Sequence, residues 1–341
     1  MTPCEGAGQL PALLLDLGPP PDQLPAAKQE LPVGASAGYG VKDMFTKLAD
    51  TTKAAIFTVL VLCLAVGAAL SINMFDLASN FVVYASVWSC TPVVATLIML
   101  LVVTRDGYSR EGWKSLGLHR LGLNVWWIAF GVTLLITVAA AAIVWATPLA
   151  SFVMPEGGIL NVLINFAVSF LILVFTFSLA EEIGMRGYLL PKLLPLGRRR
   201  ALLVSGLVFA TWHMPLLFLT PLLPVGNKLI SLPLFYGSVV AASFIYGYLR
   251  IYTGSLWPAA IAHAVHNSAW AALGAFTVTS YTVVVNKYLV GDYGLLILVG
   301  AVIAAIWVGY YLRSGMNQAQ EEAGAGIPEA PPTPAAAAVP K

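Results

Sequence analysis

Two adjacent glutamates and an arginine, Glu181, Glu182 and Arg186, interrupt an almost unbroken apolar stretch of the chain. A charged side chain at membrane depth costs roughly 2.5–3.5 kcal/mol on insertion scales, so these residues need a reason to be there. Glu182 and Arg186 lie four residues apart and share one face of a helix, where they can form an ion pair. Glu181 diverges from Arg186 by about 140° and can point elsewhere. In a low-dielectric bundle Glu181 is a candidate general base; the structural alternative is one salt-bridge cluster of all three residues.

Three of the four histidines lie in other apolar stretches of the sequence. His213 follows Phe209 by four residues, although a lone helical histidine is more often a satisfied core residue than a catalytic one. His263 and Asn267 are also four residues apart, and His266 occupies a neighbouring part of the same helix surface. A histidine and an asparagine at this spacing can polarise a carbonyl oxygen, because the amide donates a hydrogen bond without changing its protonation state. Interhelical hydrogen bonding is the structural alternative.

Membrane helices must position these side chains. Of the 341 residues, 59% are hydrophobic and 10% are charged, whereas a soluble domain has about 25% charged residues. We therefore expect an all-α, polytopic membrane bundle of about eight helices, each near the roughly 20 residues that cross a bilayer. The expected spans are 54–75, 80–104, 125–147, 160–190, 201–222, 230–250, 257–277 and 294–313. The fourth is longer than a bilayer requires, so we expect it to be tilted or to project beyond the membrane.

The chain divides into a membrane domain, residues 54–313, and two tails. Residues 1–53 and 314–341 are rich in Pro, Gly and Ala, and we expect both tails to be disordered. The first 50 residues lack a basic start followed by an apolar core, so a cleavable signal peptide is not expected. A net charge of +2 gives no reason to expect nucleic acid as a partner.

The basic residues predict the orientation of the helices. With the N-terminus in the cytoplasm, only Lys228 and Lys287 remain in the outer loops, so the positive-inside rule predicts that both termini are cytoplasmic. Glu181, His213 and His263 then all lie about 9–18 Å from the cytoplasmic ends of their helices, at roughly 1.5 Å per residue. A single water-filled site requires such a shared layer, and three independent structural roles do not predict it.

Three motifs stand in order on separate apolar spans: EEIGMR fits EExxxR, FATWH fits FxxxH, and HAVHN fits HxxxN. Each motif alone is a weak signal. Together, and with RGYLLPKL completing the first, they resemble the CPBP intramembrane proteases, a family of CAAX prenyl endopeptidases and bacteriocin-processing (Abi) proteins. The resemblance covers about residues 105–277 and leaves both tails outside it.

The resemblance implies a membrane-embedded endopeptidase with two catalytic pairs. Glu181 and His213 would activate a water molecule, while His263 and Asn267 would stabilise the oxyanion. His266 is outside the family pattern and is either a bystander or an electrostatic neighbour of His263. The remaining motif residues would have supporting roles: Glu182, Arg186 and Phe209.

Metal dependence stays open at the level of sequence. Glu181, His213 and His263 would make a reasonable zinc set of one carboxylate and two histidines, as in a metalloendopeptidase. The same residues can instead hold the attacking water directly, as in a glutamate-type protease, and we favour this interpretation, with no cofactor required. Other proteolytic chemistries have less support, because HExxH is absent and Ser205 is a weak candidate nucleophile.

The leading functional hypothesis is hydrolysis of a peptide bond in a membrane-tethered substrate, by CAAX-type or leader-peptide processing. One alternative is a non-catalytic immunity or partner protein of the same fold. Another is a proton or ion transporter, which the absence of internal repeats disfavours. The expected partners are a membrane-anchored peptide or protein and the lipid bilayer. The Ala/Gly/Pro-rich tails and the lack of a compartment signal favour the plasma membrane of a prokaryote.

Overall fold

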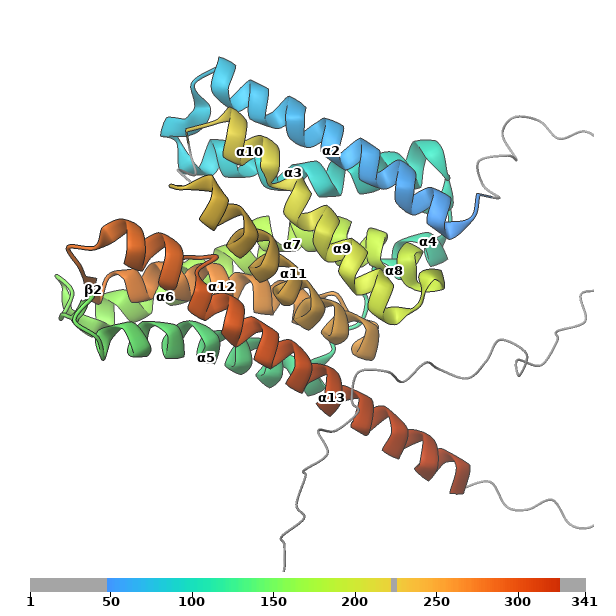
Figure 1. Ribbon diagram of the computed structural model, residues 1–341. Helices are drawn as coiled ribbons and strands as arrows, with labels where there is room; N and C mark the ends of the chain where they lie inside the picture. The colour runs from blue at the N-terminus through green and yellow to red at the C-terminus, as the bar shows by residue number, and fades with distance from the viewer. Residues whose placement is uncertain (1–47, 222–225, 326–341) are drawn as a thin grey trace, which may run out of the picture. The chain divides into compact units, whose positions relative to one another are not determined.

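The computed structural model describes residues 48–221 and 226–325, and these residues are almost entirely helical (Figure 1). The expected all-α bundle is confirmed. One two-stranded antiparallel sheet is the exception within the described residues, formed by β1 (Ser151–Phe152) and β2 (Thr277–Val278). The longer helices are α2 (Asp50–Met74), α3 (Phe81–Ile98), α5 (Trp126–Trp145), α6 (Gly158–Phe175), α9 (Arg198–Trp212), α11 (Lys228–Thr253), α12 (Trp257–Gly274) and α13 (Leu295–Ala325).

Seven helical segments in the described part of the chain are long and apolar enough to cross a membrane, one fewer than the eight expected spans. The remaining expected span, 257–277, exists as helix α12, but α12 is not among the seven. It carries two histidines and an asparagine, and it packs against α5, α6 and α11 (Figure 1). A helix surrounded by protein does not have to present an apolar surface to lipid, so its lower hydropathy fits its central place.

The fourth expected span, 160–190, lies within one candidate membrane span, Gly158–Leu196, but its helix is interrupted. Helix α6 ends at Phe175, and Thr176 has φ −126° and ψ −96°, outside the helical region. The Thr176 hydroxyl donates a hydrogen bond to the carbonyl of Ile172, and such side-chain bonds to the preceding turn bend helices. The chain resumes as α7 (Phe177–Glu182), continues through a π-helical segment, η6 (Ile183–Leu189), and ends in α8 (Leu190–Leu193).

The fifth expected span is also two helices, α9 and α10 (Met214–Leu219), instead of one helix over 201–222. His213 lies at the junction between them. Pro215 follows two residues later and has no backbone N–H, so it cannot continue the hydrogen-bond ladder of α9. The motif histidine therefore stands at the junction of two helices.

Contacts at the two ends of the helices agree with alternating crossings of the membrane. At one end, three pairs join segments that were expected to share a side: Lys192 with Asp50, Lys53 with Asp106, and Trp257 with Leu118. At the other end, the pairing of β1 with β2 joins the loop after α5 to the loop after α12. Loops expected on the same side therefore lie together, while the cytoplasmic assignment of either end stays a prediction.

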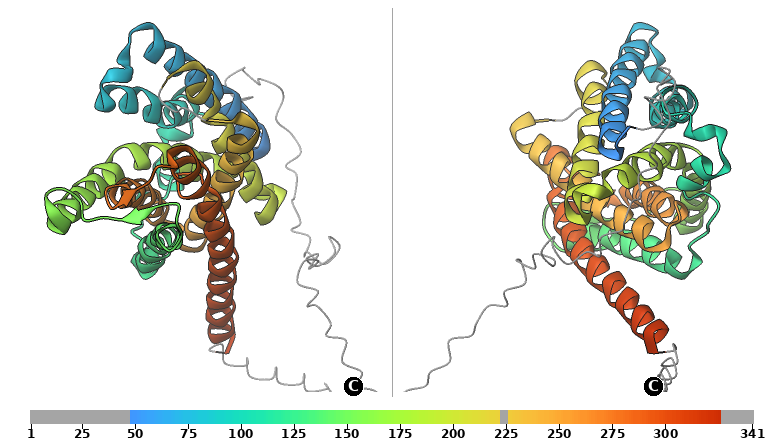
Figure 2. Two further views of the ribbon diagram at one scale, coloured as in Figure 1. Left: turned by 60° about the vertical axis from the view of Figure 1, so that its left-hand side comes forward. Right: turned by 90° about the vertical axis from the view of Figure 1, so that its right-hand side faces the viewer.

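The last candidate membrane span, Leu295–Ser314, agrees with the expected span 294–313, but the helix that contains it is longer. Helix α13 does not end near residue 313 but continues to Ala325, past the ends of the helices that it packs against (Figures 1 and 2). Residues 314–325 contain Met, Gln, Glu and Ala, which are good helix formers, and the next proline comes only at Pro328. Helix α2 likewise begins at Asp50, within the expected N-terminal tail. Residues 1–47 and 326–341 of the two expected tails lie outside the described residues.

Candidate active site

Glu182 and Arg186 form the ion pair that their helical spacing predicts. Arg186 Nη1 donates to Glu182 Oε1 at 2.7 Å, and both side chains are fully buried. Arg186 Nη2 also donates to Ser243 Oγ at 2.8 Å, which ties the pair to α11. A buried ion pair is tolerated only with good geometry and further hydrogen bonds, because both charges have lost their water. The pair therefore anchors the end of α7 to the rest of the bundle.

Glu182 also contacts the third motif. His263 Nδ1 lies 3.0 Å from Glu182 Oε1, the same oxygen that accepts the hydrogen bond from Arg186. An ionised carboxylate only accepts hydrogen bonds, so Nδ1 is the donor in this contact. Glu182 consequently fixes the plane and the tautomer of the His263 ring, a more direct role than the sequence indicated.

Glu181 points away from Arg186, as the helical geometry indicates. Its Oε1 accepts a hydrogen bond from Ser89 Oγ on α3 at 2.7 Å, and its Oε2 lies 3.9 Å from His263 Nε2. The residue is buried, with 8% of its surface exposed. The ring of His263 is therefore flanked by both glutamates, with Glu182 on one nitrogen and Glu181 near the other.

A close approach between two helical segments makes the contact with Ser89 possible. Gly184 lies in the π-helical segment η6, and a Cβ atom at this position would collide with Pro92 of α3. Only a glycine lets the two backbones come this near. Single π-helical turns are rare and occur frequently at functional sites. Here the turn follows Glu181 and Glu182 directly and carries Arg186.

His213 has a defined tautomer because its Nδ1 lies 2.8 Å from the carbonyl oxygen of Phe209. A carbonyl can only accept, so Nδ1 carries the hydrogen, and in the neutral ring Nε2 keeps its lone pair. The ring packs against aromatic neighbours, among them Trp212 at 4.6 Å and Phe235 at 5.3 Å between centroids. A fixed ring with a free acceptor nitrogen can receive a proton from water.

Phe209 connects the three motifs through its ring. The Arg186 guanidinium lies 4.7 Å from the ring centroid, and the His213 and His263 rings lie 4.9 and 5.9 Å away in edge-on contacts. The aromatic face attracts the cation, while the edge-on contacts hold the two imidazoles apart. This arrangement gives a physical reason for an aromatic residue at the first position of FxxxH.

The second and third motifs share one small cavity of about 50 Å³, which has room for more than one water molecule. His213, His263 and Asn267 all line it. Glu181 is not among the residues that line the cavity, but its Oε2 lies 3.9 Å from Nε2 of His263, which does line it. Four expected site residues from three separate helical segments are thus brought to one place, as the shared layer in the sequence indicated.

Two further residues of the cavity form a pair that the sequence did not reveal. His266 Nε2 lies 2.9 Å from Asp292 Oδ1, and both residues line the cavity. Asp292 belongs to the turn before α13, where it looked like an ordinary loop residue. Burial acts to raise the pKa of the Asp292 carboxyl, but the contact with His266 outweighs it and holds the pKa below its ordinary value. Ser89 and Ser243 were also missed, because small hydroxyl residues are common in apolar helices and carry no spacing signal.

The expected zinc ligands Glu181, His213 and His263 are not arranged as a preformed metal site in the described part of the chain. Among the residues that the structure describes, no three His, Cys, Asp or Glu side chains are arranged to hold a metal ion. In the set expected from sequence, Nδ1 of His213 contacts the Phe209 carbonyl and Nδ1 of His263 contacts Glu182, so Nε2 of each ring would be the ligand atom. His263 Nε2 and Glu181 Oε2 are 3.9 Å apart. We therefore derive no step through a metal.

The fold and site define an integral membrane protein with a polar cluster enclosed by helices. Residues 163–269 match the sequence profile of a protein family described as Type II CAAX prenyl endopeptidase Rce1-like. The matched segment contains all three motifs, from Glu181 to Asn267, so the expected resemblance to the CAAX protease family is confirmed for this part of the chain. A comparison with curated proteins found no match.

Proposed function

We propose that the protein is an intramembrane endopeptidase that hydrolyses a peptide bond of a membrane-tethered substrate. The family match supports a CAAX-type intramembrane protease. The observation that carries the proposal is the meeting of the three motifs, in which Glu182 contacts His263 at 3.0 Å and His213 shares a cavity with Asn267. The roles of individual residues and the substrate are our inference.

Water activation is assigned to Glu181 and His213. In this mechanism a water is held between the Glu181 carboxylate and His213 Nε2. It loses one proton to Glu181 while the lone pair of His213 Nε2 orients it. The water oxygen forms a bond to the substrate carbonyl carbon, and the carbonyl oxygen becomes an oxyanion. The proton held by Glu181 then passes to the leaving nitrogen as the C–N bond breaks. No covalent intermediate with the protein is required.

Oxyanion stabilisation is assigned to His263 and Asn267. The Asn267 amide donates a hydrogen bond without any change of protonation. His263 must carry a proton on Nε2 as well as on Nδ1 to donate, and the two flanking glutamates provide the counter-charge for such a ring. Glu182 and Arg186 are positioning residues in this scheme, because they fix His263 and do not touch the reacting atoms.

The substrate and its location extend the predictions from sequence. Candidates are a CAAX-type prenylated C-terminus and a leader peptide beside a membrane anchor. We place the protein in the plasma membrane of a prokaryote with both termini in the cytoplasm. The lipid bilayer then presents the anchored substrate to the site, and no nucleic acid takes part.

Proteolysis by the purified protein in liposomes tests the proposal. Wild type, Glu181→Ala and His213→Ala would be compared on prenylated and unprenylated membrane-anchored peptides. We expect cleavage by the wild type and its loss in both variants. A non-catalytic membrane protein would cleave none of the peptides, and a transporter would instead produce ion flux in the same liposomes.

Metal dependence needs its own experiment. We propose a glutamate-type mechanism, so incubation with a chelator should leave the rate of cleavage unchanged. Loss of cleavage on chelation, restored by adding back zinc, would assign Glu181, His213 and His263 to a metal and overturn the glutamate-type mechanism. A zinc metalloprotease with a known chelator response, assayed in the same liposomes, controls for access of the chelator.

A further inference from the structure

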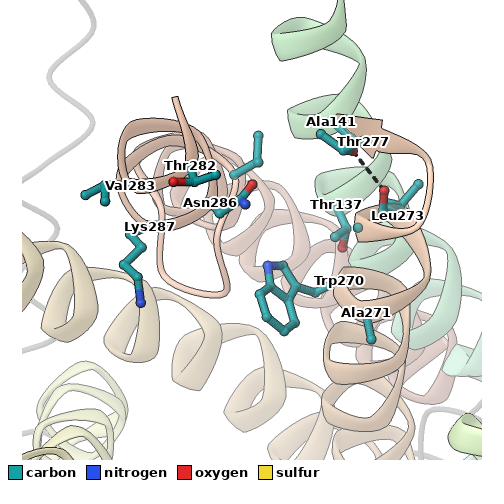
Figure 3. Close-up of a pocket in the computed structure, with 12 residues that line it drawn as sticks. Thr137, Ala141, Trp270, Ala271, Leu273, Thr277, Thr282, Val283, Asn286 and Lys287 are labelled. Atoms are coloured by element: carbon teal, nitrogen blue, oxygen red, sulfur yellow. Dashed lines mark hydrogen bonds between the residues drawn. The ribbon is translucent and has the colours of Figure 1, made fainter. Parts of the chain in front are cut away.

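A second and larger cavity, of about 480 Å³, is lined by residues close in sequence to those of the first (Figure 3). In Figure 3, Trp270 and Thr137 stand on one side, and Val283, Asn286 and Lys287 stand on the other. The walls come from α5, from the end of α12, and from the segment around η8 (Val284–Leu289). Its volume is in the range of cavities that bind small ligands or parts of larger ones, roughly 300–1,000 Å³.

The two cavities share walls on α5 and α12. On α5, Thr133 lines the small cavity and Thr137, one helical turn later, lines the large one. On α12, Asn267 lines the small cavity and Ala271 lines the large one. Four residues of helix span about 6 Å, a distance that an extended peptide covers in about two residues. A peptide bond held beside Asn267 would therefore place a side chain about two positions away in the large cavity.

The lining of the large cavity is suited to a peptide. Alanine, glycine, leucine and valine side chains leave room for an apolar group, and Trp270 offers a flat apolar wall. Polar groups stand among them, including Thr282 and Asn286. A hydrocarbon or isoprenoid chain has no hydrogen-bonding groups to match these residues, whereas a peptide backbone does.

We propose that this large cavity is a substrate subsite that receives an apolar side chain about two residues from the scissile bond. The proposal rests on the proposed endopeptidase function and deepens it, because it names the part of the substrate that determines specificity. Three observations support the subsite: its walls continue those of the small cavity, its volume suits a side chain, and its lining mixes apolar and polar residues.

Gly274 allows a direct test, because it lines the large cavity and a Cβ atom there would meet nothing within 4 Å. The first carbon of the side chain in Gly274→Leu therefore meets open space, and the rest of the leucine should reduce the volume of the cavity. Gly67 on α2 is a matched control, since its Cβ would also meet nothing within 4 Å and it lines neither cavity. Gly67→Leu adds the same side chain elsewhere.

The measurement is kcat/KM for pairs of peptides that differ only two residues from the cleaved bond, with Leu in one and Ala in the other. We expect Gly274→Leu to lose about tenfold or more on the Leu peptide, mainly through KM, with little loss on the Ala peptide. Gly67→Leu should match the wild type on both. Equal effects of Gly274→Leu and Gly67→Leu on the two peptides would overturn the subsite.

A binding experiment separates failure of the subsite from failure of the proposed function. In a Glu181→Ala protein whose own three cysteines are replaced, Gly274→Cys would be tested for disulfide cross-linking to peptides with a cysteine at successive positions. We expect cross-linking two residues from the intended bond, above the level of a Gly67→Cys control. A Gly274→Cys signal no higher than the control overturns the subsite, and preferential disulfide cross-linking to a peptide whose isoprenoid group carries a terminal thiol would assign the cavity to lipid. Both results are independent of cleavage by the wild type.

Discussion

The two cavities along α5 and α12 differ in what holds their walls. The small one, of about 50 Å³, is lined by side chains whose ring nitrogens have fixed partners, such as His213 with Phe209 and His263 with Glu182. The large one, of about 480 Å³, is lined in part by small residues such as Gly274. The difference separates two tasks: fixed donors and acceptors suit a reaction at one atom, whereas open space suits recognition of a side chain.

Both cavities are lined in part by the regular helices α5 and α12, and both lie beside interrupted helical segments. Near the small cavity these are the π-helical segment after Glu182 and the junction at His213, and at the large cavity it is the π-helical segment η8. Interruptions redirect side chains that a straight helix would send elsewhere, and those near the small cavity occur where the motif residues have to meet. Substitutions at the small cavity and at its supporting contacts test this division of tasks.

The largest expected effect comes from Glu181. Glu181→Gln keeps the size of the side chain and the acceptor for Ser89 but removes the base, so cleavage should fall by about 10²–10⁴-fold. The thermal unfolding temperature in detergent should stay close to that of the wild type. Retained cleavage would show that another group takes the proton from water.

The next effect is on stability and comes from Glu182. Glu182→Ala leaves the fully buried Arg186 without its counter-charge, which should destabilise the fold by roughly 3–5 kcal/mol. Asp50→Ala is the matched control, because it removes the partner of Lys192 from a partly exposed pair and should cost about 1 kcal/mol or less. Thermal unfolding in detergent compares them, and similar shifts would contradict the structural importance given to the buried pair.

The smallest effect is expected from the pair of His266 and Asp292. His266→Ala should cost little activity, because His266 stands outside the three motifs. The pKa of Asp292 in the folded protein lies below its ordinary value. The pair therefore stabilises the fold fully at a pH above the ordinary pKa of an aspartate. This stabilisation is lost as the pH falls through the lowered pKa of the folded state. Asp292→Asn should remove this part of the pH dependence of unfolding. A loss of cleavage in His266→Ala as large as in Glu181→Gln would move the centre of the site.

Much of this arrangement could be predicted from the sequence, for identifiable reasons. Long apolar stretches and the spacing of four residues within each motif depend only on local geometry, so the helices and the pair of Glu182 with Arg186 could be foreseen. The break at Thr176 could not be predicted. Threonines are common in helices, and the hydrogen bond from this one to Ile172 has no signature in the sequence. Contacts between distant segments, such as Ser89 with Glu181, leave no local pattern at all.

Hydrolysis by a water molecule that Glu181 and His213 activate is tested most directly by cleaving one membrane-anchored peptide in ¹⁸O-labelled water. The products are then analysed by mass spectrometry. We predict that the wild type cuts a single bond and that the new carboxylate carries one ¹⁸O atom from water. Neither product should form with Glu181→Ala or His213→Ala. Cleavage that is unchanged in both variants would contradict the proposed mechanism, and the buried charges would then be a structural cluster only.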